Sequence, residues 1–403
     1  MAMMDFDTAQ HTLAKAGQPL AASEQCPLHL ANGRVLAQTL FAAVNLPAAS
    51  NSGMDGYAIR HADYLPGVAL PIQQRCFAGE QPAPLQPGKA TRLFTGSLMP
   101  EGADTVIMQE NTQETDGHVQ ILYAPVLGDH VRHAGEDVTH GDQLLAMGTL
   151  LGPAQIALLA AQGYGEVPVY RPLRVGVITT GDELVPVGQP RADHQIYDVN
   201  GPMLAALLHT MGVQVTGIKH ARDTVDSLKK AFHDLLPGCD LILTVGGVSV
   251  GEKDLVKPVL ASMGAELELW RVAMKPGKPV ALAHLGKTPV VCLPGNPVSA
   301  FVVYTLLVTP LIRTLQGRSH IFPAIGYGQL ATDTTFLEKR EEFLRVQVKM
   351  AEGTPPQLLP YALQGSHIIR SLDHAGALAR IPIHTRRGNG DPVTYYDLHT
   401  WLR

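Results

Sequence analysis

The sequence predicts a multidomain protein of the α/β plus β class, built around a central, doubly wound α/β domain with a mostly parallel sheet. Between residues 171 and 317, β-branched runs such as RVGVITT alternate with helix-like segments, a pattern typical of a sheet with helices on both faces. Short apolar runs between Gly, Pro and Asp turns precede this region and indicate a β-rich N-terminal part. After residue 318 the alternation stops, and runs such as FLRVQVKM predict a small C-terminal β domain.

At 403 residues the chain is too long for one ordinary hydrophobic core. We expect four regions. Residues 1–45 together with 141–170 would form an N-terminal linker or dimerisation region, and residues 46–140 a β-rich domain. Residues 171–317 would form the α/β domain, and residues 318–403 the C-terminal β domain.

Helix signals refine the α/β region. Asn200 and Asp223 each precede an apolar periodic segment, so each is predicted to cap a helix. The apolar run FVVYTLLVTPLI lies in a predicted helix over 298–316 and is interrupted by Pro310. Because this run is too short to span a bilayer, we expect a buried core helix.

Composition excludes several classes of protein. The net charge is −5 and no basic stripe is interleaved with aromatic residues, which argues against nucleic-acid binding. The start, MAMMDFDTAQ, lacks the basic segment of a secretory signal. Cys26, Cys76, Cys239 and Cys292 form no CxxC pair, so we expect buried, reduced thiols in a cytoplasmic protein with no membrane partner.

Three loops at predicted strand ends carry the clearest functional signal. They begin at Gly181, Gly246 and Pro294, and in an open α/β sheet such loops meet at one edge, where ligands bind. Each loop alone is explained by a tight turn, but three together predict a site for a phosphorylated anion. Neither the Walker nor the dinucleotide motif is present. The residues expected to contact the anion are Thr180, Gly181, Asp182, Gly246, Gly247, Ser249, Gly251, Pro294, Gly295, Asn296, Pro297 and Ser299.

The segment MKPGKP places Lys275 and Lys278 on a rigid Pro-Gly turn. Two lysines held close together repel unless an anion lies between them, so the turn predicts a second anion site. The alternative is an ordinary solvated turn.

Acidic residues follow the same loops. Carboxylates beside a phosphate site commonly bind Mg²⁺, so Glu183, Asp223 and Asp254 are candidate metal-binding or catalytic residues. For Asp223, a role as a helix cap alone is an equally good explanation.

Seven segments identify a family resemblance. In chain order they are SGMDGYA, RLFTGSLMPEGADTVIMQE, GEDV, TTGDEL, GGVSVGEKD, MKPGKP and LPGNPVSAF. Together they resemble the molybdopterin molybdenumtransferase family, to which the gephyrin E domain is related. The resemblance covers nearly the whole chain and is weaker in the C-terminal region.

The resemblance implies an elongated homodimer of four-part subunits with active sites between the subunits. Such an enzyme takes adenylylated molybdopterin and molybdate, needs a divalent metal such as Mg²⁺, releases AMP and yields the molybdenum cofactor. A transient contact with the adenylyltransferase of the preceding step is also expected. Molybdate and tungstate are both tetrahedral dianions, and the sequence does not distinguish them.

The resemblance also implies roles for residues far from the α/β loops. Asp55 would face Glu183 across the dimer, and both are candidate metal ligands. Thr95, Gly96 and Asp137 would lie near Asp55. For the oxyanion, the candidates are Lys275, Lys278 and Ser366, with one of Arg340 or Arg345.

Two other functions remain as alternatives. A molybdopterin adenylyltransferase shares the α/β domain, but such proteins typically have GGTG in the second loop, where this chain has Val248, and they lack the Asp55 region. A gephyrin-like scaffold is the other alternative, but this chain carries no fused second enzyme domain or long linker.

Overall fold

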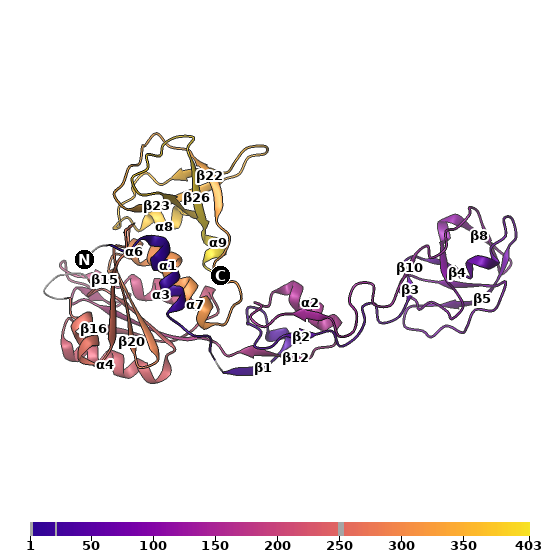
Figure 1. Cartoon of the computed structure of the whole chain (residues 1–403), viewed down its shortest axis with the longest axis horizontal. Coiled ribbons are helices and arrows are strands. Elements are labelled where there is room, and N and C mark those ends of the chain that lie inside the picture. The colour runs from indigo at the N-terminus through magenta and orange to yellow at the C-terminus, as the bar shows by residue number, and fades with distance from the viewer. Residues whose placement is uncertain (1–2, 21, 249–253) are drawn as a thin grey trace.

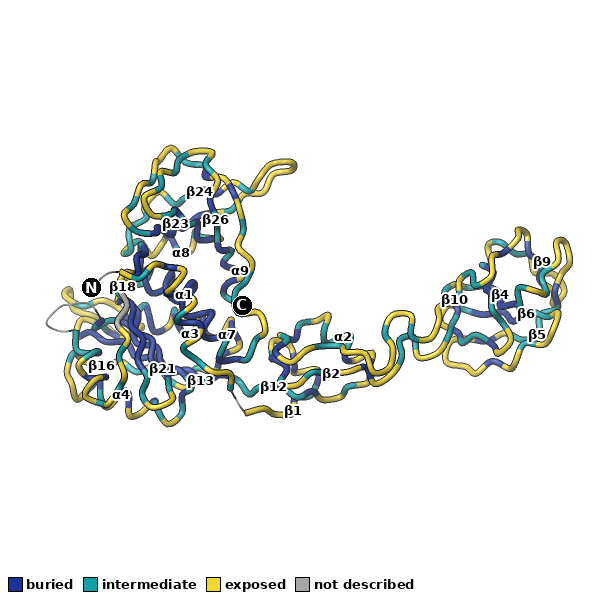
Figure 2. Tube along the Cα trace, viewed as in Figure 1, coloured by how far each residue is buried: buried dark blue, intermediate teal, exposed yellow. Residues whose placement is uncertain are grey.

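The computed structural model, which describes residues 3–20, 22–248 and 254–403, has three bodies joined along a long axis (Figure 1). The α/β domain and the C-terminal β domain lie together at one end, and the β-rich domain lies at the other. A narrower middle region with strands β1 and β12 joins them. Buried residues are concentrated in the end bodies, while much of the connecting chain is exposed (Figure 2).

The central sheet confirms the predicted fold class. Its strand order is β16-β13-β17-β21-β20-β18. The first four strands are parallel, and β20 and β18 form an antiparallel edge. The strands are β13 (Arg174–Thr180), β16 (Gln214–Ala221), β17 (Leu241–Val245), β18 (Glu266–Arg271), β20 (Pro279–Leu285) and β21 (Thr288–Leu293).

Helices cover both faces of this sheet because alternate strand residues point to opposite sides. Leu243 and Val291 belong to the core formed with α3 (Asn200–Thr210), whereas Ile242 and Val290 belong to the core formed with α4 (Val225–Leu235) and α5 (Val256–Ser262). The double winding predicted from the sequence is therefore confirmed.

Both predicted helix caps are wrong by one residue. The side chain that caps α4 is Thr224, whose hydroxyl accepts a hydrogen bond from the Ser227 amide. Asn200 is already helical, and its side chain donates to the carbonyl of Gly295 instead (2.8 Å). Asp223 therefore does not cap α4, and its side chain can interact with the strand-end loops.

The apolar helix runs from Pro297 to Leu315 as α6 (Pro297–Val303), a π-helical turn (Tyr304–Val308) and α7 (Thr309–Leu315). By length and composition it is long enough to cross a membrane, which corrects the expectation based on its length. It is nevertheless 94% buried inside the protein, as predicted for a core helix.

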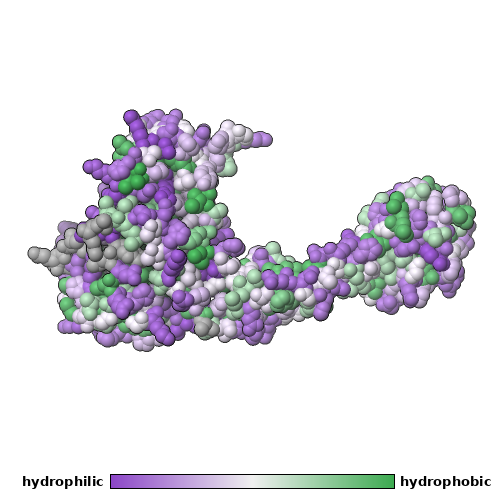
Figure 3. Space-filling model, viewed as in Figure 1, coloured by the Kyte–Doolittle hydropathy of each residue, from purple (hydrophilic) through white to green (hydrophobic). Residues whose placement is uncertain are grey.

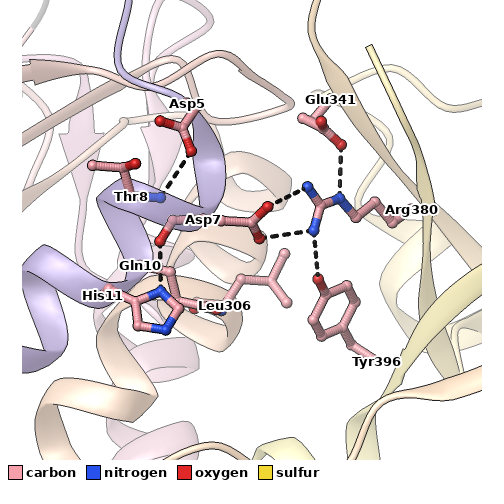
Figure 4. Close-up of polar contacts among 9 residues, drawn as sticks. All are labelled: Asp5, Asp7, Thr8, Gln10, His11, Leu306, Glu341, Arg380 and Tyr396. Carbon is pink, nitrogen blue, oxygen red and sulfur yellow. Dashed lines mark hydrogen bonds and ion pairs between the residues drawn. The ribbon is translucent and has the colours of Figure 1, made fainter. Parts of the chain in front are cut away.

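Pro310 does not end this helix, because another helix supplies the missing hydrogen bond. Proline has no N–H to donate to the carbonyl four residues earlier, which belongs to Leu306. The buried side chain of Gln10, in α1 (Phe6–Lys15), donates to that carbonyl at 2.7 Å (Figure 4).

We expect Gln10→Leu to lower the free energy of unfolding by about 1–3 kcal/mol, since the buried Leu306 carbonyl would lose the hydrogen bond that Gln10 donates to it. Urea denaturation measures this. Gln214→Leu, which changes an exposed glutamine in the same domain, should alter the value by less than about 0.5 kcal/mol. Equal effects of the two substitutions would contradict this account of Gln10.

Helix α1 also joins the α/β and C-terminal domains. Phe6 packs against Phe343 and Tyr396, and Asp7 accepts two hydrogen bonds from Arg380 at 2.8 Å each (Figure 4). This packing differs from the predicted grouping of residues 1–45 with 141–170. We therefore propose to assign residues 3–20 to the α/β region and keep the other predicted boundaries.

The middle region is made of short antiparallel pairs and one helix. Strand β1 (Ser23–Pro27) pairs with β12 (Glu166–Tyr170), β2 (Leu40–Phe41) pairs with β11 (Gln143–Leu145), and α2 spans Pro153–Ala161. These elements enclose a small core of their own.

The β-rich domain has a sheet with strand order β7-β4-β6-β5-β9-β8. Its strands are β4 (Gly56–Ile59), β5 (Leu70–Cys76), β6 (Ala90–Leu93), β7 (Thr105–Met108), β8 (Thr112–Thr115) and β9 (His118–Ile121), and β3 (Asn51–Ser52) pairs separately with β10 (Val131–Arg132).

The C-terminal domain is a small barrel, because β23 pairs with both β24 and β25 and thereby closes the ring. Its strands are β22 (Gly326–Leu330), β23 (Glu341–Lys349), β24 (Gln357–Pro360), β25 (Ala377–Ile381) and β26 (Pro392–Asp397), with the short helices α8 (Arg370–His374) and α9 (Leu398–Trp401). A strand of the lysine turn, β19 (Met274–Lys275), pairs with β23 and connects the barrel to the α/β domain.

Candidate functional site

The carboxyl ends of β13, β17 and β21 open into one cavity of about 1070 Å³. The three glycine-containing loops that follow these strands meet there, as predicted for the edge of a parallel sheet. The predicted residues that line the cavity are Thr180, Gly181, Glu183, Asp223, Gly246, Gly247, Asp254, Pro294, Gly295, Asn296 and Pro297.

Two of these glycines are required by the local geometry. Gly246 has φ +95°, and a Cβ atom there would lie 2.7 Å from the carbonyl oxygen of Thr180. Gly247 has φ +62°, and its Cβ would lie 2.8 Å from Val256 Cγ2. Only glycine allows this left-handed backbone to pack so closely against the neighbouring loop. The Gly246 amide donates to the Leu293 carbonyl at 3.2 Å, which fixes the loop on the end of β21.

Carboxylates line the same cavity. Glu183 folds back over Gly181, with Oε2 2.6 Å from the position that a Cβ of residue 181 would take. Within the described part of the chain, its carboxylate has no hydrogen-bond partner. Asp223 accepts from Thr180 Oγ1 at 2.8 Å and from the Asp182 amide at 3.3 Å, so it connects two of the loops.

Residues 3–20, 22–248 and 254–403 contain no group of three His, Cys, Asp or Glu side chains arranged to hold a metal ion. A cation at this site would therefore need ligand oxygens from a substrate. Mg²⁺ meets this condition, because it commonly takes one or two carboxylates and completes its shell with phosphate oxygens and water.

Several cavity residues were missed by the sequence reasoning. Strands β14 (Leu184–Val185) and β15 (Ile196–Tyr197) pair beside the cavity, and the segment between them contributes Arg191, Asp193 and Gln195 to its wall. His367 and Ile369 reach it from the C-terminal domain. In the sequence, the available signal was the apolar pair Ile196 and Tyr197 in an otherwise polar segment. In the structure these two side chains are 56% and 41% exposed.

Asn200 was predicted only as a cap, yet it lines the cavity. Its Nδ2 is occupied by the Gly295 carbonyl, while its buried Oδ1 has no partner in the described residues. An unsatisfied buried acceptor at a cavity wall is costly unless a ligand supplies a donor.

Four predicted contacts in the loops have a different outcome. Asp182 is not among the residues that line the cavity, and its carboxylate accepts a hydrogen bond from the Asp223 amide at 3.2 Å. Ser299 is 5% exposed inside α6, away from the cavity lining. Ser249 and Gly251 lie outside the described residues.

The lysine turn is not arranged as predicted. Lys275 Nζ lies 2.6 Å from Glu338 Oε1 and 3.1 Å from Glu342 Oε1, so two carboxylates already balance its charge. Burial opposes the charged form of Lys275, but the hydrogen bonds to these carboxylates raise its pKa overall. The argument that an anion must separate Lys275 from Lys278 is therefore wrong, and Lys278 is exposed.

The structure separates the two arginine candidates. Arg345 is fully buried and donates to Ser371 Oγ and to the carbonyls of Phe343 and Gly365, so it supports the fold and does not reach a ligand. Arg340 donates to the Met274 carbonyl at 3.1 Å, beside the lysine turn.

The residues around Asp55 form a separate cluster in the β-rich domain. The Thr95 amide (2.8 Å) and hydroxyl (2.7 Å) both donate to Asp55 Oδ1. These bonds, aided by Arg92, lower the pKa of Asp55 and keep it ionised. Gly96 follows Thr95 in this turn, and Asp137 lies exposed in a neighbouring loop.

Within one chain, the Asp55 cluster and the strand-end cavity do not meet. Asp55 lies between β3 and β4, at the end of the molecule opposite to the α/β domain (Figure 1). The expected pairing of Asp55 with Glu183 is not formed inside a single subunit.

Sequence and structure comparisons cover the chain almost completely. Family models match for the "MoeA N-terminal region (domain I and II)" at residues 4–163, a "probable molybdopterin binding domain" at 176–314 and the "MoeA C-terminal region (domain IV)" at 327–398.

Individual relatives agree. The chain is 36% identical to the molybdopterin molybdenumtransferase of Haemophilus influenzae, over 97% of this chain and 98% of that protein. A protein of the same name from Nostoc sp. is 36% identical over 90% of this chain and 85% of its own length. The crystal structure of a molybdopterin biosynthesis MoeA protein from Pyrococcus horikoshii OT3 superimposes with a TM-score of 0.83 at 26% identity, covering 98% of this chain and 100% of that one.

Proposed function

Because the chain belongs to the molybdopterin molybdenumtransferase family, we propose that it inserts molybdenum from molybdate into adenylylated molybdopterin, releasing AMP and yielding the molybdenum cofactor. One observation carries the assignment to this site: three glycine loops and four carboxylates converge on a single large cavity at the strand ends. Glycine loops let the backbone approach phosphate oxygens closely, and carboxylates suit a cation bound to these oxygens.

The cavity fits the size and polarity of this substrate. Its volume of about 1070 Å³ is at the upper end of the range for ligand sites, as a pterin joined to a nucleotide requires. We assign the pyrophosphate to the loops at Gly181, Gly246 and Gly295. The unpartnered Oδ1 of Asn200 would accept an N–H of the pterin ring.

Mg²⁺ is part of the proposal. Glu183 would hold it from the cavity side, and Asp55, kept ionised by Thr95, would hold it from a second subunit. Mg²⁺ held there would supply Lewis-acid polarisation of the phosphoanhydride bond that breaks when AMP leaves. Thr180 and the Asp182 amide fix the Asp223 carboxylate, which suits Asp223 to orient water. We assign Asp254 to the same cluster and Asp137 to the cluster of Asp55.

The homodimer follows from the position of Asp55. If Asp55 and Glu183 act on one substrate, a second copy must supply one of them, because one chain holds them at opposite ends. Exposed apolar side chains favour such association: Leu122, Val126 and Leu127 are each about 60% exposed or more on the β-rich domain, whose surface carries hydrophobic patches (Figure 3).

The oxyanion is assigned to the lysine turn and its neighbours. Pro279, directly after Lys278, and His367, directly after Ser366, both line the cavity. On the strength of these two neighbours in sequence, we assign Lys275, Lys278, Arg340 and Ser366 to one end of the substrate site, where donors to a tetrahedral dianion are needed.

A cytoplasmic location and a transient contact with the preceding adenylyltransferase complete the proposal. The four cysteines are all buried and unpaired, as expected of a protein in a reducing compartment.

The test uses the purified protein with adenylylated molybdopterin, molybdate and Mg²⁺. We expect AMP release coupled to cofactor formation, and removal of the metal with EDTA should reduce the rate by roughly 100-fold or more. Incubation with ATP and molybdopterin alone is the matching control. Adenylylation there, without molybdate-dependent AMP release, would instead support the adenylyltransferase alternative.

A further inference from the structure

Among the described residues, two carboxylates contact Lys275, a lysine of the proposed oxyanion site. Lys275 Nζ contacts Glu338 at 2.6 Å and Glu342 at 3.1 Å. Both acids come from the C-terminal domain, so they reach the lysine across the contact between β19 and β23. A carboxylate oxygen and an oxyanion oxygen accept the same N–H donors, and Glu338 and a bound oxyanion would therefore compete for Lys275.

The two acids differ in how easily they can leave. The side chain of Glu342 is 4% exposed, and breaking its pair would leave a buried charge without a partner. The side chain of Glu338 is 32% exposed, and water can solvate it once it leaves the lysine. Glu342 is thus the permanent partner of Lys275, and Glu338 is the exchangeable one.

The backbone allows this exchange without a domain movement. The carbonyl of Glu338 accepts a hydrogen bond from the His384 amide at 3.0 Å, which anchors the loop, while its carboxylate contacts Lys275 alone in the described residues. A change of side-chain rotamer is enough to release the lysine. Arg340, two residues later, already lies against the Met274 carbonyl and stays as a second donor.

Charge gives the exchange its direction. With both carboxylates in place, Lys275, Glu338 and Glu342 sum to one negative charge, which cancels the positive charge of Arg340 beside the turn and leaves no net attraction for a dianion. Departure of Glu338 makes this group neutral and frees one N–H of the ammonium group. We propose that Glu338 is an internal competitor of the oxyanion: it holds Lys275 while the site is empty and must be displaced when a tetrahedral dianion binds. This inference rests on the proposed function, because it takes the lysine turn as the oxyanion site.

The test is the binding of molybdate to the full chain, measured by isothermal titration calorimetry in a buffer of low ionic strength without sulfate or phosphate. Glu338→Gln should lower the Kd for molybdate roughly ten-fold, since one negative charge beside the ligand is removed. Glu352→Gln is the matched control: it removes the same charge from an exposed position of the same domain, and should change the Kd by less than about two-fold. In turnover, Glu338→Gln should lower the KM for molybdate and leave kcat unchanged.

Lys275→Met separates the possible failures. If Lys275→Met abolishes binding but Glu338→Gln binds molybdate no more tightly than the wild type, the competitor role is wrong and the lysine site stands. If Lys275→Met binds as well as the wild type, or no variant binds molybdate at all, the assignment of the oxyanion to this turn is wrong, and the competitor role falls with it.

Discussion

Producing the Asp55→Asn and Glu183→Gln chains together in one cell is expected to restore about one quarter of wild-type molybdenum insertion, although each variant alone should lose roughly 100-fold or more. Half of the dimers formed at random would be mixed. In each of these, one of the two sites would combine an intact Asp55 from one chain with an intact Glu183 from the other. Activity is measured as AMP release by the unselected mixture of dimers. Mixed dimers isolated through two different tags should instead reach about half of the wild-type rate.

A matched pair of variants tests the sharing itself. Glu183 and Asp223 line the cavity of the same subunit. A Glu183→Gln chain produced together with an Asp223→Asn chain should therefore restore no activity, because every cavity carries one of the two substitutions. If the Asp55 and Glu183 variants also fail to complement each other, although their dimers form and remain folded, the site is not shared between subunits as proposed.

Gly246→Ala is expected to reduce AMP release by roughly 100-fold, because displacing a substrate contact by about 1 Å has effects of this size. The added Cβ would lie 2.7 Å from the Thr180 carbonyl oxygen, at a backbone φ of +95°. The loop must move away from β13, and the part of the cavity wall that Gly246 and Gly247 form moves with it. Calorimetric titration with AMP would show the same loss as weaker binding.

Gly264→Ala is the control for this change. Gly264 has φ +82°, and a Cβ there would meet no heavy atom within 4 Å. It therefore carries the same kind of backbone strain, about 1–2 kcal/mol, without the clash and outside the cavity lining. If Gly264→Ala is as stable as Gly246→Ala but binds AMP normally, the loss of binding in Gly246→Ala comes from the clash with the Thr180 carbonyl and not from backbone strain. Normal activity of Gly246→Ala would refute the proposed phosphate cradle.

Local patterns predicted the elements well, and contacts distant in sequence account for the failures. The alternation of β-branched runs with helical segments was enough for the double winding, because the central strands β13, β17 and β21 are buried on both faces. The cap of α4 was misplaced because Asp223 and Thr224 are adjacent and both suit that position. Only the fold reveals that Thr180, in another strand, binds the aspartate.

The candidate site was predicted in the same uneven way. Glycine loops at strand ends could be placed on one cavity because parallel strands share their carboxyl edge. The neutralisation of Lys275 was invisible, since Glu338 and Glu342 are more than sixty residues later and come from another domain. Similarly, Phe6, Ala9 and Leu13 share one apolar face of α1, but an apolar face does not identify the surface that it covers.

The packing of α1 also constrains how the protein is made. This helix is translated well before its partners Leu306 and Arg380, which follow 296 residues after Gln10 and 373 residues after Asp7. The β-rich domain and the middle region lie between them in the sequence, and each has its own core, so they can fold during synthesis. Until the last strands emerge, Phe6 and Leu13 stay without the core that buries them. Slow translation or a chaperone that covers this amphipathic segment should therefore affect the yield of folded protein more strongly than the same treatment applied to the β-rich domain.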